Sequence, residues 1–256
     1  MLSSLLPAPS RFLACLCLLG SGLVNVANGI GENEKHAEAL IKWLHSEKNG
    51  YFNSKLEMRR SDPSDPESFF GMFAKEDLAV KSLLLRIPKS IILDSTEEDP
   101  ELTPMVCGTV RNLAKQLKLG NESDYAPYVN YLLDTQPPGQ LPSAWSSAGK
   151  RLLTRFLEGD DERSIEFPPE YPIEWLTDDW RQECDGSKDP MEEYAALLVV
   201  QRAWDDLLIP VYDMMSHRNG WRLNTMSKNV HEAEYVSVNA RRDIKAGEEI
   251  YTTYNM

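Results

Sequence analysis

Residues that could take part in chemistry gather near the C-terminal end of the sequence, where a polar turn holds His217. Residues 235–238 alternate in polarity, which is typical of a half-buried strand. Residues 250–254 are β-branched and aromatic, which favours a second strand. Because Gly247 marks a tight turn between them, we expect two strands joined by a glycine turn. Such a unit would bring His217 and Tyr254 near one place.

These residue types allow several kinds of chemistry, and the spacing argues against most of them. The other histidines, His36, His45 and His231, show no spacing typical of a metal site, so we expect none. Glu248 and Glu249 could be paired catalytic carboxylates, but beside a glycine turn they favour a solvated turn edge. The sequence has no Walker loop, nucleophile elbow, dinucleotide fingerprint or calcium loop. A tyrosine at a strand end either packs its ring with a wet hydroxyl or orients a reacting group.

The elements that must position these residues are β at both ends of the chain and α in the middle. A helix is expected over residues 34–48, from the apolar spacing i, i+3, i+4, i+7. Strands are predicted over 69–78 and 83–88, the second ended by a proline. The middle is predicted to hold four helices: 99–120, 125–133, 147–157 and 189–204. This order predicts an α+β protein with a helical insertion.

A short pattern, A-x-x-D-[L/I], occurs near both ends of the chain. It reads Ala74 to Leu78 in the first copy and Ala240 to Ile244 in the second, each at a strand–turn–strand unit. The pattern is too short for a repeat architecture. We expect two similar β-hairpins that lie together.

The composition is acidic, with 27 basic and 40 acidic side chains in 256 residues. The chain is long enough for an ample core in one large domain or two small ones. The negative balance argues against non-specific nucleic-acid binding, and it suits a soluble protein or one that meets basic substrates.

The first 29 residues have the form of a secretory signal peptide. Arg11 precedes a short apolar run and small residues that end at Gly29. The run is too short for a comfortable membrane span, so no stable membrane insertion is expected after cleavage. An uncleaved anchor and another kind of targeting presequence remain alternatives. Removing the segment takes away one arginine and no acid, which makes the net charge of −13 more negative by one.

Two cysteines, Cys107 and Cys184, remain after removal of the leader. In an oxidising compartment they could pair, and two buried free thiols are an equally good interpretation. Asn121-Glu122-Ser123 is a glycosylation sequon, which matters only if the chain enters the secretory pathway.

Taken together, the terminal motifs resemble the SET domain of protein methyltransferases. The nearest branch looks like that of the Rubisco large-subunit lysine methyltransferases and the actin-histidine methyltransferase. Its members carry P-x-x-D-x-x-N-H, then A-x-R-D-I-x-x-G-E-E-I, then a tyrosine. This sequence reads Pro210-Val-Tyr-Asp213-Met-Met-Ser216-His217, then residues 240–250, then Tyr254. The resemblance covers roughly residues 37–254.

The resemblance implies a SET-like β fold, built from the N- and C-terminal strand segments around the helical insertion. It implies S-adenosylmethionine as cofactor and a protein substrate that presents a lysine or histidine side chain. Tyr254 takes the place of the catalytic tyrosine, and His217 that of the histidine whose backbone contacts the adenine. The segment whose backbone contacts the methionine part of the cofactor is Gly71, Met72, Phe73 and Ala74.

Three departures from the family pattern bear on activity. Ser216 stands where the relatives have an asparagine whose amide reaches the cofactor, and Phe69 stands where they have a glycine. Relatives also continue past the tyrosine with a Y-G-F segment and a substrate-binding domain, whereas this sequence stops two residues after Tyr254. We therefore carry a second hypothesis, a truncated or inactive SET-like protein that acts as a protein-binding module.

The expected organisation follows from these motifs. Residues 1–29 are the signal peptide, 30–95 the first part of the SET-like domain, 96–206 the helical insertion and 207–256 the second part. The leader predicts entry into the secretory pathway, with secretion or targeting to an organelle.

Overall fold

The computed structural model describes residues 32–65, 68–96, 105–138, 145–158, 180–227 and 234–253. The expected signal peptide and Tyr254 lie outside these residues. Within the described ranges, no helix combines the length and the apolar character needed to span a membrane.

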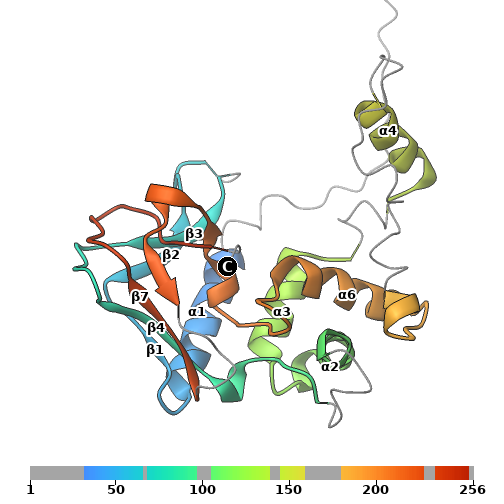
Figure 1. Ribbon diagram of the computed structural model, residues 1–256, viewed down its shortest axis with the longest axis horizontal. Coiled ribbons are helices and arrows are strands. Elements are labelled where there is room, and N and C mark those ends of the chain that lie inside the picture. Colours follow the sequence, from blue (N-terminus) through green and yellow to red (C-terminus); the bar gives the residue numbers. More distant parts are fainter. Residues whose placement is uncertain are drawn as a thin grey trace, which may run out of the picture.

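The centre of the β part is a four-stranded antiparallel sheet with strand order β1-β4-β7-β6 (Figure 1). Two smaller pairs complete it: antiparallel β2-β3 and parallel β5-β8. The strands are β1 (Tyr51–Phe52), β2 (Leu56–Arg60), β3 (Phe70–Ala74), β4 (Leu83–Pro88), β5 (Ser216–His217), β6 (Thr225–Ser227), β7 (Tyr235–Ala240) and β8 (Tyr251–Thr252). The sheet therefore joins strands from both ends of the chain.

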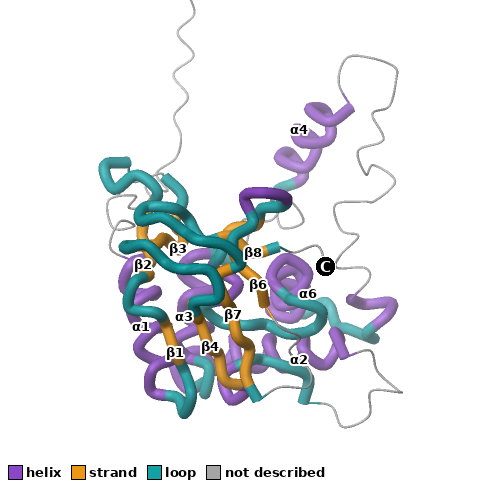
Figure 2. Tube along the Cα trace, turned by 60° about the vertical axis from the view of Figure 1, so that its left-hand side comes forward, coloured by secondary structure: helices purple, strands orange, loops and turns teal. Residues whose placement is uncertain are grey.

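Helices cover the sheet and form a block beside it (Figures 1 and 2). They are α1 (Glu32–Ser46), α2 (Met105–Leu119), α3 (Ala126–Thr135), α4 (Ser147–Glu158) and α6 (Pro190–Arg202). Single 3-10 turns are η2 (Lys89–Ile91), η3 (Gly120–Glu122), η5 (Tyr212–Met214) and η6 (Gly220–Arg222). Leu40 and Leu44 of α1 are fully buried, as the apolar spacing predicts.

The start of α6 shows how the sequence sets a boundary. Asp189 is its N-cap, and the side chain accepts hydrogen bonds from the backbone N–H groups of Met191 and Glu192. Pro190 follows at the first helical position, where no N–H is needed. The helix packs against α2, and a disulfide between Cys107 of α2 and Cys184 ties α2 to the segment before α6. The pairing that the sequence left open is thus present.

The two copies of the A-x-x-D-[L/I] pattern pair with each other. Leu78 and Ile244 exchange backbone hydrogen bonds of 2.9 Å in both directions. The Asp77 carboxylate accepts from the N–H of Ala246 at 3.0 Å, and Asp243 accepts from the N–H of Val80 at 2.8 Å. The two contacts are equivalent. Each aspartate accepts from the N–H of the residue that lies three positions after the aspartate of the other copy.

Further backbone hydrogen bonds join the two copies on either side of the Leu78–Ile244 pair. The N–H of Lys81 donates to the carbonyl of Ala240 at 2.8 Å, and the N–H of Gly247 donates to that of Ala74 at 2.7 Å. Both donors have a left-handed backbone, with φ of 70° at Lys81 and 85° at Gly247. We call residues 74–82 the front crossing and 240–248 the back crossing. The prediction that the two patterns lie together is confirmed.

The prediction that each copy forms a β-hairpin is wrong. β3 pairs with β2, whereas β4 pairs with β1 and β7. At the other end β7 pairs with β4 and β6, whereas β8 pairs with β5. The strands before and after each turn therefore have different partners. β3 does not pair with β4, and β7 does not pair with β8.

The observed architecture is α+β, as predicted. The domain boundaries expected from the sequence stay a prediction, although α2, α3, α4 and α6 do lie between the two groups of strands.

Candidate functional site

The site begins at β3, whose backbone is held on both edges. One edge pairs with β2, and the other meets the chain that follows the back crossing. The N–H of Ala74 donates to the carbonyl of Glu248 at 2.9 Å, and the N–H of Ile250 donates to that of Met72 at 2.8 Å. The two ends of the sequence that resemble the SET motifs are therefore in direct contact.

Gly71 is the one position in β3 without a side chain on the face shared by Phe69 and Phe73. A Cβ at Gly71 would lie 3.2 Å from Oε1 of Glu249, and 3.5 and 3.6 Å from the rings of Phe69 and Phe73. Half of the Phe69 side chain is exposed, and its ring stacks on Phe73 at a centroid distance of 6.2 Å. Phe69, which stands where the resemblance implies a glycine, thus lies at the surface.

Glu249 is buried, with 9% of its surface exposed, and its Oε1 has no hydrogen-bond partner among the described residues. The expectation of a solvated turn edge is therefore wrong for Glu249. It holds better for Glu248, which is partly exposed and pairs with Arg242 at 2.8 Å. Burial and the hydrogen-bonding carboxylate of Glu249 raise the pKa of the Tyr251 hydroxyl.

Sequence reasoning missed Asn224, which holds the backbone around Glu249 from the opposite side. Its side chain is fully buried and donates to the carbonyl of Glu249 at 2.7 Å. It also accepts from the N–H of Tyr251 at 2.7 Å. One side-chain amide thus satisfies the two backbone groups that a neighbouring strand would otherwise satisfy. No local pattern in the sequence marks this asparagine.

Ser216 and His217 form β5 and run parallel to β8, with Ser216 opposite Tyr251 and His217 opposite Thr252. Both side chains are partly exposed. These two predicted residues therefore lie next to the segment that carries Glu249. Tyr251, the partner of Ser216, is two residues after Glu249 in the sequence. Gly71 contacts the same segment, since a Cβ at Gly71 would lie 3.2 Å from Oε1 of Glu249. The described part of this segment ends at Thr253, one residue before Tyr254.

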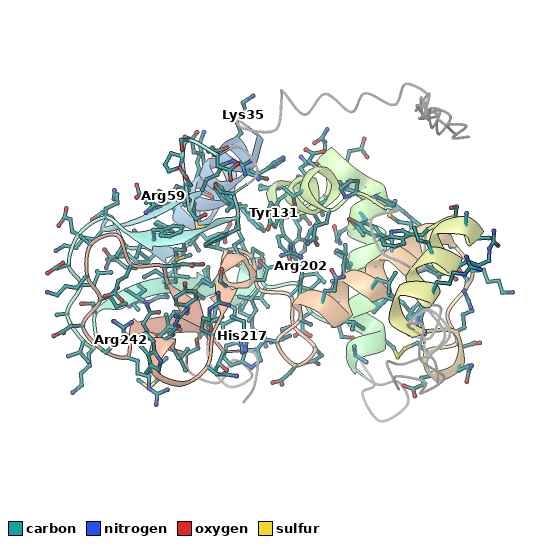
Figure 3. The ribbon with its side chains drawn as sticks, turned by 90° about the horizontal axis from the view of Figure 1, so that it is seen from above. Lys35, Arg59, Tyr131, Arg202, His217 and Arg242 are labelled. Atoms are coloured by element: carbon teal, nitrogen blue, oxygen red, sulfur yellow. A yellow bond between two sulfur atoms is a disulfide. The ribbon has the colours of Figure 1, made fainter. Side chains whose placement is uncertain are left out.

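The approach to β5 is fixed by a buried ion pair. Arg202 at the end of α6 lies 3.0 Å from the carboxylate of Asp213, which also accepts a 2.6 Å hydrogen bond from Tyr128. The guanidinium lies 5.3 Å from the ring centre of Tyr131, and Figure 3 shows both where the strands meet the helices. Burial raises the pKa of Asp213, and Arg202 opposes that rise.

The backbone is strained at the same place. Val211 has φ of 70° and ψ of −41°, a left-handed conformation that a β-branched residue rarely adopts. Its side chain is buried, with 1% of its surface exposed. The surrounding packing therefore holds the chain in one conformation just before Ser216.

A pocket of about 250 Å³ opens beside β8, and its lining is mostly apolar. Trp204 and Tyr212 stack there at a centroid distance of 5.2 Å, and the Tyr212 hydroxyl lies 2.8 Å from Oγ1 of Thr252. The residues that line it are Trp204, Tyr212, Leu223, Thr225, Met226, Ser227, Arg241, Thr252 and Thr253. Sequence reasoning did not single out this pocket, because its walls come from five separate segments.

The expectation of no metal site stays a prediction for the chain as a whole, and the structure bears on the described residues only. In those ranges no three histidine, cysteine, aspartate or glutamate side chains are grouped so as to hold a metal ion. His36 instead lies 3.0 Å from Asp134.

Comparison with known proteins agrees with this arrangement. A solved structure of the SET domain of LSMT bound to lysine and AdoHcy is 16% identical, with a TM-score of 0.53, and the match covers 87% of this chain and 54% of that one. A structure of Rubisco LSMT bound to AdoMet is 17% identical, with a TM-score of 0.52 and coverage of 86% and 53%. These likenesses show the fold, and the chain spans about half the length of those proteins.

No match was found among the curated proteins. The family model of the SET domain, however, matches residues 70–255. This range holds β3 to β8 and every predicted site residue, from Gly71 to Tyr254, and it also holds Glu249. The chain belongs to the SET-domain family.

Proposed function

We propose that this protein is an S-adenosylmethionine-dependent protein N-methyltransferase that acts on a lysine or histidine side chain. The observation that carries the proposal is the buried Glu249 carboxylate beside Gly71, where the two SET motifs meet. A buried carboxylate with one unpartnered oxygen costs free energy unless a cation or donor reaches it. S-adenosylmethionine carries two positive groups, an ammonium and a sulfonium, and the solved relatives are described as bound to AdoMet or AdoHcy.

The residues present fit such a cofactor. Gly71 leaves the space that a side chain would fill, and glycine allows a ligand to approach the backbone closely. Glu249 supplies a negative charge for a positive group, and Ser216 supplies one hydroxyl that can donate or accept. When bound, the cofactor supplies a methyl group on a positively charged sulfur. The chain's own part is to bind and orient it and to keep water out.

The acceptor nitrogen must arrive without its proton. Free lysine has a pKa of about 10.4, so a largely apolar, water-poor pocket that disfavours the charged form helps to deprotonate it. The lining of the pocket beside β8 is mostly apolar, and the stacked rings of Trp204 and Tyr212 offer an apolar wall for an aliphatic stem. Its lining includes Thr252 and Thr253, which lead directly to Tyr254. We assign the Tyr254 hydroxyl to orient the acceptor nitrogen.

The test is transfer of a labelled methyl group from S-adenosylmethionine to proteins in a cell extract. Hydrolysis of the labelled proteins and separation of the amino acids distinguishes methyl-lysine from methyl-histidine. Tyr254→Phe should lower the rate by about a hundredfold or more, since the hydroxyl that positions the nitrogen is lost. Tyr235→Phe is the matched control, because this partly exposed tyrosine of β7 lies outside the site, and its rate should equal that of the wild type.

A second candidate function is a non-catalytic protein-binding module. Ser216 favours it, because a serine makes fewer hydrogen bonds than the family's asparagine. Such a protein would show no cofactor binding and no labelled product, while a folded sample still retained partner proteins. Saturable cofactor binding by the folded chain would reject this alternative.

A further inference from the structure

The sequence contains a single N-x-S/T tripeptide, Asn121-Glu122-Ser123. It lies in η3, at the corner between α2 and α3. Asn121 is exposed, and its Oδ1 accepts a 2.8 Å hydrogen bond from Asn130. Its Nδ2, the atom that a glycan would occupy, donates no hydrogen bond to any described residue. Because Asn121 is exposed, the folded corner leaves room for a large group on this side chain.

Ser123 has the opposite environment. Only 7% of its surface is exposed, and its hydroxyl donates to the side chain of Gln116 at 2.7 Å. The hydroxyl also accepts from the backbone N–H of Tyr125 at 2.9 Å. An enzyme that recognises the serine hydroxyl can reach it only before this corner folds. Modification during synthesis is compatible with the structure, whereas modification of the folded protein is not.

The disulfide is an independent indication of the same compartment. Cys107 and Cys184 are both buried, and their bond joins positions 77 residues apart in the sequence. Such disulfides form and persist in oxidising compartments such as the lumen of the endoplasmic reticulum, and are rare in the cytosol. N-glycosylation takes place in that lumen, and the sequence of residues 1–29 has the form of an export signal.

We propose that Asn121 is an N-glycosylation site and that the chain folds in the lumen of the secretory pathway. In the transfer step, Nδ2 of Asn121 forms a bond to C1 of the first sugar of a polyprenyl-diphosphate-linked oligosaccharide. The bond between C1 and the phosphate oxygen breaks, the polyprenyl diphosphate leaves, and the amide loses one proton. No electrons are gained or lost.

The attached glycan would not block the candidate functional site. Its corner belongs to α2 and α3, whereas the site is built from β3, β5 and β8. The glycan would stand next to Leu119, an apolar side chain with 39% of its surface exposed. A bulky hydrophilic group there shields apolar surface from other molecules. This inference does not depend on methyltransferase activity.

The test uses the full-length chain expressed in eukaryotic cells, with peptide mapping by mass spectrometry before and after treatment with a peptide N-glycosidase. The wild type should show one glycan, removed by the enzyme with conversion of Asn121 to aspartate. Asn121→Gln and Ser123→Ala should abolish the glycan. Ser123→Thr is the matched control, because threonine keeps both the sequon and a hydroxyl, and it should remain glycosylated.

Two outcomes would overturn the proposal. One is an unmodified Asn121 in the folded wild-type protein. The other is a glycan that persists in Asn121→Gln, a variant whose exposed side chain should leave folding intact. Circular dichroism and non-reducing peptide mapping of the Cys107–Cys184 bond check the fold of each variant. Cofactor binding is measured on the same samples, so that loss of the proposed enzymatic function is recorded separately.

Discussion

The front and back crossings share the same backbone contacts, but they are followed by residues of different chemical character. In both, an aspartate caps the other copy and a left-handed residue closes the turn. The front crossing continues into Leu83, which pairs with Asn239 in the central sheet. The back crossing continues into Glu249, which occupies the equivalent position and pairs with Phe73. One copy places a leucine where the other buries a carboxylate.

This difference separates the structural role from the functional one. Leucine after the front crossing leads into β4, whose next residues Leu84 and Leu85 are fully buried in the core. A buried carboxylate with an unpartnered oxygen at the equivalent position adds a cost that the backbone pattern does not require. We therefore interpret Glu249 as a residue kept for binding a cation, and the front crossing as its structural counterpart.

Replacing Glu249 by leucine gives the back copy the same residue as Leu83 of the front copy. Of the substitutions considered, it should change the affinity for S-adenosylmethionine most. Loss of a hydrogen bond to a charged group costs about 1.5–3 kcal/mol, so affinity for S-adenosylmethionine should fall about ten- to a hundredfold. The free energy of unfolding should stay the same or rise, because an apolar side chain replaces a buried carboxylate with one oxygen that has no hydrogen-bond partner among the described residues. Calorimetric titration and guanidinium unfolding measure the two quantities.

Glu248→Leu is the matched control, since this neighbouring carboxylate pairs with Arg242 and not with the site. Cofactor affinity should remain that of the wild type. Equal affinity losses in the two variants would show that total charge matters and that Glu249 has no special position.

Ser216→Asn should have the opposite effect to Glu249→Leu and should raise the affinity for the cofactor. The family's asparagine offers an amide donor and a carbonyl acceptor where serine offers one hydroxyl. Cofactor affinity should rise about tenfold, the equivalent of one hydrogen bond to a charged group. The same titration measures it, and an unchanged or weaker affinity would contradict the placement of Ser216 at the cofactor.

Gly71 differs from its counterpart in the back copy, Ser237 of β7, which tolerates a side chain. In Gly71→Ala the new Cβ would stand 3.2 Å from Oε1 of Glu249, closer than ordinary contact. The carboxylate must then move by a few tenths of an ångström. Affinity should fall by about 1 kcal/mol, or roughly fivefold, and Ser237→Ala should leave it unchanged. If both substitutions act alike, the glycine has no role in binding.

Replacing the aspartates of the two crossings by asparagine should have the smallest effect, a change in stability that depends on pH. The hydrogen bond from Lys245, and then that from the N–H of Ala246, lower the pKa of Asp77 from 3.8. Its ionised form therefore stabilises the fold above pH 3.8, and this contribution is lost as the pH falls through the lowered pKa. Among the described residues, Lys245 forms its ion pair with Asp77, and no lysine forms one with Asp243. Asp77→Asn should lower the guanidinium midpoint at pH 7 more than Asp243→Asn does.

The pH series supplies the contradicting outcome. As the pH is lowered below 3.8, the midpoint difference between the wild type and Asp77→Asn should shrink. A difference that persists or grows at acidic pH would mean that the carboxylate contributes in its protonated form, against the lowered pKa.

Local patterns in the sequence predicted the long helices, four of the strands and the meeting of the two crossings, but they did not predict β1, β2, β5 or β6. The helix over residues 34–48 and the start of α6 at Asp189 follow from apolar spacing and capping, which are local. Strand partners were not predictable, because pairing depends on segments far apart in sequence. For the same reason the local pattern around Glu249 favours a solvated turn edge. Its burial comes from Gly71 and Phe73, more than 170 positions earlier.

The most direct test of the account is calorimetric titration of the folded chain with S-adenosylmethionine. The account predicts saturable binding at one site, competition by S-adenosylhomocysteine, and at least tenfold weaker binding in Glu249→Leu. A folded wild-type protein that releases no heat, or a Glu249→Leu variant that binds as tightly as the wild type, would contradict it.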